Sequence, residues 1–320
     1  MSAAASSLGR RLRVAFSRDQ LGYLFASPWL LGFLALTAIP MVASLLLSFV
    51  DWNGINVAQI KWVGFKNFSR ALDDDNVLIA LKNTAYYSFI AVPLGLTCSL
   101  ILAMLLNQKL RGIAIFRTIF YMPTVIGGVA TIMMWLWVFN PDFGLLNVVL
   151  RPCGDLLSRI GLLHPGWEPP KWIYDPRWSK PSMIMMSVWG AGGGGMLIFL
   201  AALQNVPDHL LEAASIDGAS RLQQFRHVTI PQISPAIFFN LVMGVIGSFQ
   251  VFNEAYIMTS GGPSRSTLFY VLYLYNKAFQ DFEIGYASAL AWILFGIILV
   301  FTLLIVRSSA VWVYYEGERK

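Results

Sequence analysis

Charged residues are scarce in this sequence. Asp, Glu, Lys and Arg make up only 12% of its 320 residues, whereas an ordinary soluble domain carries about 25%. Hydrophobic residues reach 57% and aromatic residues 14%, which excludes an intrinsically disordered chain. The mean hydropathy is +0.61. The composition therefore indicates a membrane protein.

Cysteine, histidine and phosphate-binding motifs are equally rare. The two cysteines, Cys98 and Cys153, form neither a disulfide framework nor a metal-binding spacing. The three histidines, His164, His209 and His227, have no paired carboxylate cluster near them in the sequence. No Gly-Lys dipeptide occurs, so a G-x-x-x-x-G-K-[ST] phosphate loop is excluded. We predict no enzyme activity, no metal site and no cofactor bound by this chain.

Long uncharged runs define the expected fold. Six of them contain no Asp, Glu, Lys or Arg: 20–50, 83–108, 118–141, 181–207, 227–253 and 284–306. A helix needs about 20 apolar residues to cross the hydrocarbon core of a membrane. Helices buried in a large soluble protein would show shorter runs with charged faces. We therefore predict an all-α membrane protein with six transmembrane helices, at 23–50, 84–107, 118–140, 181–204, 236–259 and 285–306.

These helices divide the chain into three parts. An N-terminal tail covers 1–22, the membrane domain 23–306 includes a connecting loop at 205–235, and a C-terminal tail covers 307–320. The first run is too long for a cleaved signal peptide and follows four arginines, so we expect it to remain as an anchor.

Basic residues indicate the orientation. If the N-terminus is cytoplasmic, 12 Lys and Arg residues lie on the cytoplasmic side and 11 on the outer side. The cytoplasmic segments are shorter than the outer ones, and their basic residues lie close to the ends of the spans. We therefore expect both termini in the cytoplasm. The net charge of +6 then suits a membrane surface better than nucleic acid. Tryptophans in the two long outer segments suit interfacial anchoring, with docking of an external partner as the alternative.

The loop at 205–235 has strong helix signals. Pro207 suits the start of a helix that runs to Ile216, and Gly218 suits its end. Ser220 with Gln223 forms the pattern of a capping box for a second helix, which we expect to end near Pro231. The loop is thus predicted to be a helix–turn–helix on the cytoplasmic surface. The residues alone favour equally a docking element and a structured loop without a partner.

The residues of this loop resemble a known family. The run Glu212-Ala213-Ala214-Ser215-Ile216-Asp217-Gly218-Ala219 is similar to the EAA loop of binding-protein-dependent ABC importer permeases. Further similarities point to the carbohydrate-importer branch, including its alginate-oligosaccharide importers. They are Lys61 to Phe68, Met122-Pro123, Trp135 to Asn147 and Tyr256 to Pro263. The sequence shows neither the additional N-terminal spans nor the large inserted external domain of the maltose-type member.

The resemblance implies a function and a set of partners. The chain would form the pathway of a carbohydrate importer in the bacterial inner membrane, in a heterodimer with a second permease. Two ATP-binding subunits, on which ATP and Mg act, and an extracytoplasmic solute-binding protein would complete it; no nucleic acid is implied. The residues implied to couple to the ATPase are Glu212, Ala213, Ala214, Ser215, Asp217 and Gly218.

Polar residues inside the predicted spans indicate a pathway. Glu254 is the only Asp, Glu, Lys or Arg within a predicted span, and such residues are costly in a membrane. Gln250 and Asn253 lie near it. Sugars bind to aromatic faces and planar polar groups, so we predict a site formed by Trp135, Trp189, Gln250, Asn253 and Glu254.

Two other function classes fit less well. A secondary transporter would be expected to carry several intramembrane ionisable groups and inverted repeats. A membrane enzyme would need a catalytic constellation, which the sequence lacks. One difficulty stays open: an ionised Glu254 would repel a uronate oligomer, so it would have to be protonated, bind a neutral hydroxyl or face the partner permease.

Overall fold

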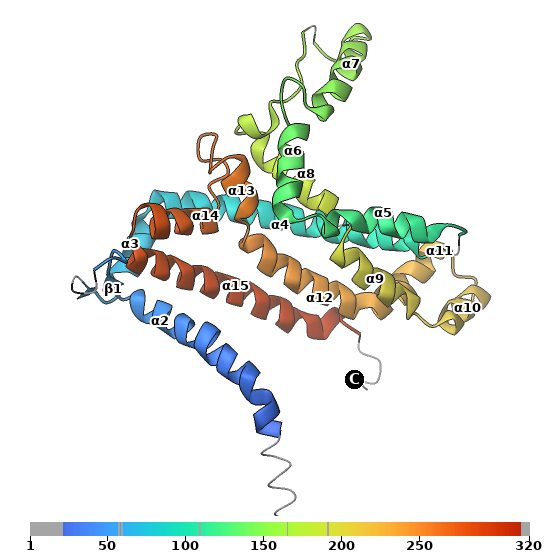
Figure 1. Ribbon diagram of the computed structural model, residues 1–320. Helices are drawn as coiled ribbons and strands as arrows, with labels where there is room; N and C mark the ends of the chain where they lie inside the picture. The colour runs from blue at the N-terminus through green and yellow to red at the C-terminus, as the bar shows by residue number, and fades with distance from the viewer. Residues whose placement is uncertain are drawn as a thin grey trace, which may run out of the picture.

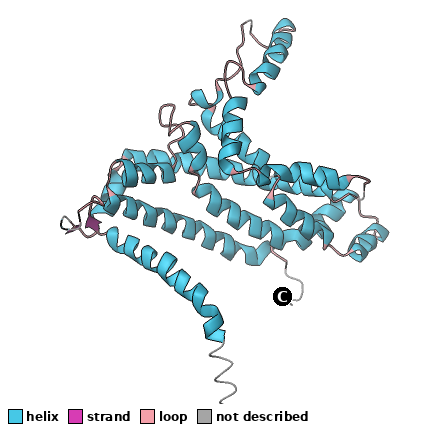
Figure 2. Cartoon of the chain, in the orientation of Figure 1, coloured by secondary structure: helices cyan, strands magenta, loops and turns pink. Residues whose placement is uncertain are grey.

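The computed structural model describes residues 22–314 except 57, 59, 109, 165 and 191. Most of this part is helical, and the remainder is mainly loops (Figure 2). Several basic residues used for the orientation lie outside the described residues: Arg10, Arg11, Arg13, Arg18, Lys109, Arg319 and Lys320.

Helices long enough to cross a membrane dominate the described chain. They are Gly22–Leu47, α4 (Asp75–Leu106), the helix Arg221–Met258 and α15 (Ile284–Trp312). The first of them includes a π-helical turn at Leu34–Ala38 and α2 (Ile39–Leu47). Two bent pairs add to these four: α5 (Ile113–Val125) with α6 (Gly128–Val138), and α8 (Ser179–Gly190) with α9 (Gly194–Gln204). Counting each pair as one span gives six, and the all-α membrane fold is confirmed.

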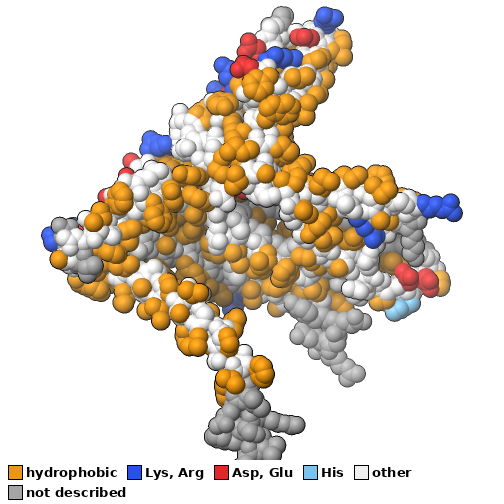
Figure 3. Space-filling view, in the orientation of Figure 1, with side chains coloured by type: hydrophobic (Ala, Val, Ile, Leu, Met, Phe, Trp, Pro, Cys, Tyr) orange, Lys and Arg blue, Asp and Glu red, His pale blue; other side chains and the backbone are white. Residues whose placement is uncertain are grey.

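The long helices form a bundle. α4 packs against α9 and α12 (Ile230–Phe249), and α12 also packs against α15. The first helix leans away from the bundle, while α6 and α7 (Leu145–Arg159) project from it (Figure 1). Hydrophobic side chains cover most of the face in Figure 3, and charged ones gather on the projection and at the two ends of the bundle. This distribution is the one expected of a protein immersed in lipid.

The first predicted span ends earlier than expected. The helix stops at Leu47, and Val50 and Asp51 instead form β1, which pairs antiparallel with β2 (Lys61–Trp62). The side chain of Asn67, on α3 (Lys66–Asp73), donates hydrogen bonds to the carbonyls of Ser48 and Val50, at 3.0 and 2.9 Å. The first bond satisfies a carbonyl that the end of a helix leaves free, and the second joins β1 to α3.

The helix that contains the second predicted span, α4, begins at Asp75, nine residues before the predicted start of the span at 84. The Asp74 carboxylate accepts a hydrogen bond from the Asn76 amide at 2.9 Å and so caps α4. A cap of this kind starts a helix wherever it occurs, whether or not the following residues are apolar. The charged residues Asp75 and Lys82, which precede the predicted span, therefore belong to the same helix.

The third and fourth predicted spans are not continuous helices. α5 and α6 meet at 97°, and α8 and α9 meet at 43°. The two breaks pack together, because a side chain at Gly193 would collide with Thr124 and one at Gly192 with the Phe120 carbonyl. Broken helices are tolerated at membrane depth only where protein or a cavity surrounds them.

A polar cluster joins three helices at the end of the bundle that carries β1. The Asp74 carboxylate accepts hydrogen bonds from the hydroxyls of Tyr273, on α14 (Tyr270–Tyr275), and Tyr286, on α15, at 2.5 and 2.8 Å. Arg70 forms an ion pair with Glu283 at 2.8 Å and lies 4.1 Å from the centre of the Tyr286 ring. We call these five residues the Asp74 clamp. Burial alone would raise the pKa of the Asp74 carboxyl, but the two tyrosine hydroxyls hold that pKa below its ordinary value.

Candidate functional site

The first helix of the predicted loop forms as expected. α10 (Asp208–Ile216) begins directly after Pro207, which has an extended backbone, and Asp208 lies in its first turn. At its other end, the amides of Gly218 and Ala219 donate to the carbonyls of Ser215 and Ala214, at 3.1 and 2.9 Å. This is the Schellman arrangement, which needs a left-handed residue. Gly218 supplies it with a φ of +78°.

The second helix of the loop also begins as predicted. Ser220 and Gln223 make both bonds of the capping box, and α11 (Arg221–Gln224) follows. Its predicted end near Pro231 is wrong, because the backbone continues through a π-helical segment at Phe225–Thr229 into α12. A proline is tolerated in a helix where other groups satisfy the carbonyl that it leaves free. The loop and the fifth span therefore share one helix.

One side-chain contact ties the two helices of the loop together. The Ser215 hydroxyl accepts a hydrogen bond from the Gln224 side-chain amide at 3.0 Å, and the same amide donates to the Ala219 carbonyl at 3.0 Å. Gln224 was not predicted from the sequence. Its position one helical turn from Ser220 was the available signal.

The outer face of the loop is open. Glu212, Ala213, Ser215, Asp217 and Gly218 are exposed, and Ala214 is half-buried. Two large apolar side chains project from the same loop, with Ile216 87% and Leu222 74% exposed. Within the described part of the chain, the Glu212 carboxylate makes no hydrogen bond or ion pair. Exposed apolar side chains grouped with a free carboxylate are typical of a protein-binding surface.

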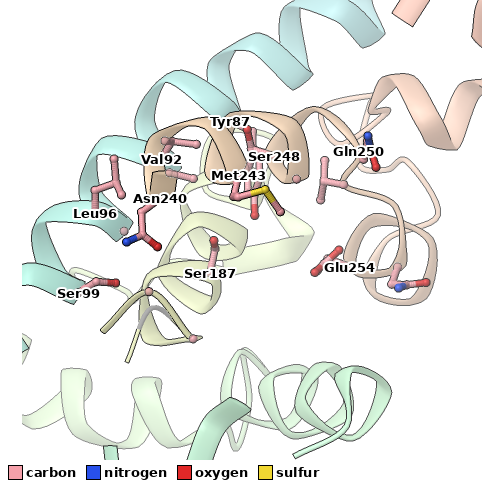
Figure 4. A pocket seen from close by; sticks show the side chains of 18 of the residues that line it. Tyr87, Val92, Leu96, Ser99, Ser187, Asn240, Met243, Ser248, Gln250 and Glu254 are labelled. Atoms are coloured by element: carbon pink, nitrogen blue, oxygen red, sulfur yellow. The ribbon is translucent and has the colours of Figure 1, made fainter. Parts of the chain in front are cut away.

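A cavity of about 550 Å³ lies inside the bundle. Residues of α4, α8, α9 and α12 line it, together with the interruption after α12 and the start of α13 (Asn253–Met258) (Figure 4). Glycines form part of the wall, among them Gly195 and Gly244, where an added Cβ atom would lie only 3.2 Å from a side chain of α4. The helices therefore approach closely at one side of the cavity and leave space at the other.

Three of the predicted pathway residues meet at this cavity. Gln250, Asn253 and Glu254 all line it, where the chain leaves α12 and enters α13. The Glu254 carboxylate forms no hydrogen bond or ion pair with any described residue. The lining contains no Lys, Arg or His among the described residues, so Glu254 sets the charge of this space.

The two predicted tryptophans lie elsewhere. Trp135 is buried, with its ring 4.9 Å from Phe139 and 5.8 Å from Trp189 between centroids. Its indole N–H has no hydrogen-bond partner among the described residues. Trp189 lines a separate, largely apolar cavity of about 540 Å³ between α4, α5 and α8. The two rings thus pack edge to face, and neither lines the polar cavity.

Other polar residues of the cavity were not predicted as site residues. Tyr87 and Ser99 come from α4, Ser187 from α8 and Asn240 from α12. The hydroxyls of Tyr87 and Ser187 lie close enough to interact. A cation also lies on α8: the Lys180 ammonium donates to the Asn83 side-chain oxygen at 3.0 Å but does not line the cavity. Polar residues with helical spacing in the uncharged runs were the signal for these positions.

Comparison with known proteins gives a consistent result. The family model for the "Binding-protein-dependent transport system inner membrane component" matches residues 93–313. The probable ABC transporter permease protein YesP of Bacillus subtilis (strain 168) is 42% identical over 303 residues, 93% of each chain. The lactose transport system permease protein LacF of Rhizobium radiobacter is 34% identical, over 89% of this chain and 93% of its own.

A solved structure has a similar fold. A chain of a bacterial ABC transporter involved in the import of the acidic polysaccharide alginate matches with a TM-score of 0.77 at 25% identity. The match covers 94% of this chain and 98% of that chain.

Proposed function

The chain belongs to the family of binding-protein-dependent transport system inner membrane components, and we propose that it forms half of the pathway of an ATP-driven oligosaccharide importer. It is a permease subunit of an ABC transporter and not itself an enzyme. In this proposal a second permease completes the pathway, as a heterodimer. Two ATP-binding subunits dock on the cytoplasmic side, and an extracytoplasmic solute-binding protein delivers the sugar.

One observation carries the proposal. A continuous helical backbone runs from Arg221, in the exposed loop, to Phe249, beside Gln250 at the cavity. In this proposal a movement imposed on the loop passes to the cavity wall through one continuous helix. Coupling between two sites needs an element that both of them bias, and this helix meets that requirement.

The loop provides the docking surface. We propose that Glu212 forms polar contacts with the ATPase subunit, while the small side chains of Ala213 and Ala214 let α10 approach it closely. Ser215, Asp217 and Gly218 fix the end of α10 and its angle to the next helix. ATP and Mg act in the partner subunits, where hydrolysis supplies the movement.

The cavity provides the pathway. We propose that Gln250, Asn253 and Glu254 bind sugar hydroxyls in transit, and that Trp135 and Trp189 supply aromatic faces when the helices rearrange. The unpaired indole N–H of Trp135 supports this role, because a buried donor without a partner is costly. An acidic oligosaccharide would meet repulsion from an ionised Glu254, so the proposal is limited to carbohydrate as a class.

Uptake by the reconstituted transporter tests the coupling role. We expect Glu212→Lys to abolish ATP-driven oligosaccharide uptake into proteoliposomes while the complex still assembles, because a charge reversal opposes docking. Glu168→Lys is the matched control, since it makes the same change at an exposed residue outside the loop. Wild-type uptake by Glu212→Lys would contradict the assignment of the loop.

Cysteine labelling tests the orientation. We propose that both termini and the loop lie in the cytoplasm and that α7 lies outside. The natural Cys153, on α7, is exposed, so an impermeant thiol reagent should label it in intact cells. A cysteine at Ser220, in a chain with Cys98 and Cys153 replaced, should react only in opened cells. The reverse pattern would invert the topology.

A further inference from the structure

The chain packs against α12 after α15 ends. The helix ends at Trp312, Val313 adopts an extended backbone, and only 6% of Val313 is exposed. The Trp312 ring packs at a steep angle against Phe238 of α12, with 6.2 Å between ring centroids. The last described residues therefore lie against the bundle, near the ends of α9 and α12 (Figure 1).

A single hydroxyl joins this segment to α12. Pro235 has no N–H, so the Pro231 carbonyl lacks the donor that an α-helix would normally supply. The Ser234 hydroxyl donates to that carbonyl at 2.6 Å and accepts a hydrogen bond from the Tyr314 backbone amide at 2.8 Å. Ser234 is 2% exposed. Its hydroxyl thus satisfies two backbone groups at once.

The contact lies at the base of the coupling loop. Tyr314 borders a cavity of about 310 Å³ together with Asn205 and Val206, where α9 leads into the loop, and Gln232 and Ile233, where the loop helix enters the bundle. Both ends of the loop and the end of α15 therefore meet at one point. At its opposite end α15 is held by Tyr286 of the Asp74 clamp.

We propose that Ser234 and Tyr314 are positioning residues for the coupling loop. The segment after α15 holds the base of the loop, so a movement of the loop reaches α15 as well as α12. Both helices then move together when the ATPase subunits act. This inference rests on the proposed importer function.

The test measures coupling, which a purely structural role would leave unchanged. In the complete complex in proteoliposomes, we expect Ser234→Ala to lower the number of oligosaccharides imported per ATP hydrolysed by about two- to ten-fold, the range given by the loss of one hydrogen bond. Ser234→Thr, which keeps the hydroxyl, should restore the ratio. Ser309→Ala is the matched control, because that hydroxyl makes its bond within α15, to the Val306 carbonyl.

A second variant covers the case in which Ser234→Ala does not assemble. Tyr314→Pro removes the backbone donor and leaves Ser234 and the Pro231 carbonyl paired, and it should lower the same ratio. An unchanged ratio in an assembled Ser234→Ala or Tyr314→Pro complex, whatever its melting temperature, would overturn the inference. Normal uptake by Glu212→Lys would instead contradict the importer coupling itself, so the two failures are distinguishable.

Discussion

The two ends of the bundle are stabilised in different ways. At one end, the Asp74 clamp joins α3, α14 and α15 through bonds between residues more than 190 positions apart, such as Asp74 with Tyr273. At the other end, the loop from Pro207 to Gln224 is held by short-range bonds, of which Ser220 with Gln223 is typical. The first arrangement fixes helices to one another. The second gives a loop its own shape and leaves its surface free for a partner.

After Glu212→Lys, the largest expected effect is at the turn of the loop. Gly218→Val should reduce uptake roughly ten-fold or more, because a β-branched residue at positive φ costs about 1–2 kcal/mol or forces the turn to change. No described atom lies near enough to Gly218 to obstruct a side chain, so backbone conformation alone is tested. Uptake is measured in proteoliposomes.

Gly112→Val is the matched control for that variant. Gly112 has a φ of +81° and equally open surroundings, but it precedes α5 instead of lying in the coupling loop. Equal losses in the two variants would show that general backbone strain reduces uptake, and not a change in the angle between the two helices of the loop.

A smaller effect is expected in the cavity. Gln250→Ala and Glu254→Gln should each change uptake by about two- to ten-fold, as the loss or weakening of a hydrogen bond to substrate would. ATP hydrolysis should continue, because the loop is intact. Gln280→Ala, at an exposed position away from the cavity, is the control. Unchanged uptake in both cavity variants would remove this end of α12 from the pathway.

Stability is expected to depend on the clamp more than on its neighbours. Asp74→Asn should lower stability by about 1.5–3 kcal/mol, the usual contribution of a hydrogen bond to a charged group. Asp73→Asn, an exposed neighbour, should leave the melting temperature unchanged. Thermal unfolding in detergent compares the two variants. Equal melting temperatures would mean that the clamp contributes nothing.

The smallest effect concerns pH. The pKa of Asp74 is lower in the folded protein than its ordinary value, which is about 3.9 in an unfolded chain. Its contribution is therefore present above about pH 4 and is lost as the pH falls through the folded pKa. The difference in melting temperature between wild type and Asp74→Asn should shrink between about pH 5 and pH 3. A constant difference would contradict the role of the charge.

Short-range features could be predicted from the sequence. Gly218 and the Ser220–Gln223 box were predicted correctly, because helix ends depend on residues only a few positions apart. The predicted end near Pro231 failed for a different reason. The π-helical segment Phe225–Thr229 carries the backbone past Pro231 into α12, and nothing in the spacing alone predicts that segment.

The cavity was predictable only in part. Gln250, Asn253 and Glu254 are polar within an apolar run, and the structure brings them to one cavity. Trp135 and Trp189 gave no comparable signal, because an aromatic residue suits a core as well as a sugar site. Tyr87 and Ser187 meet only because α4 packs against α8.

Local composition and residues close in the chain suffice to predict the class of protein, the uncharged runs and the structured loop. Helix packing is needed to select which face of each run lines the cavity, where the spans break and how Tyr314 meets Ser234. The membrane explains this division. Lipid and protein neighbours are equally apolar, so a transmembrane helix carries little pattern to mark its inner face, and only packing against the other helices selects it.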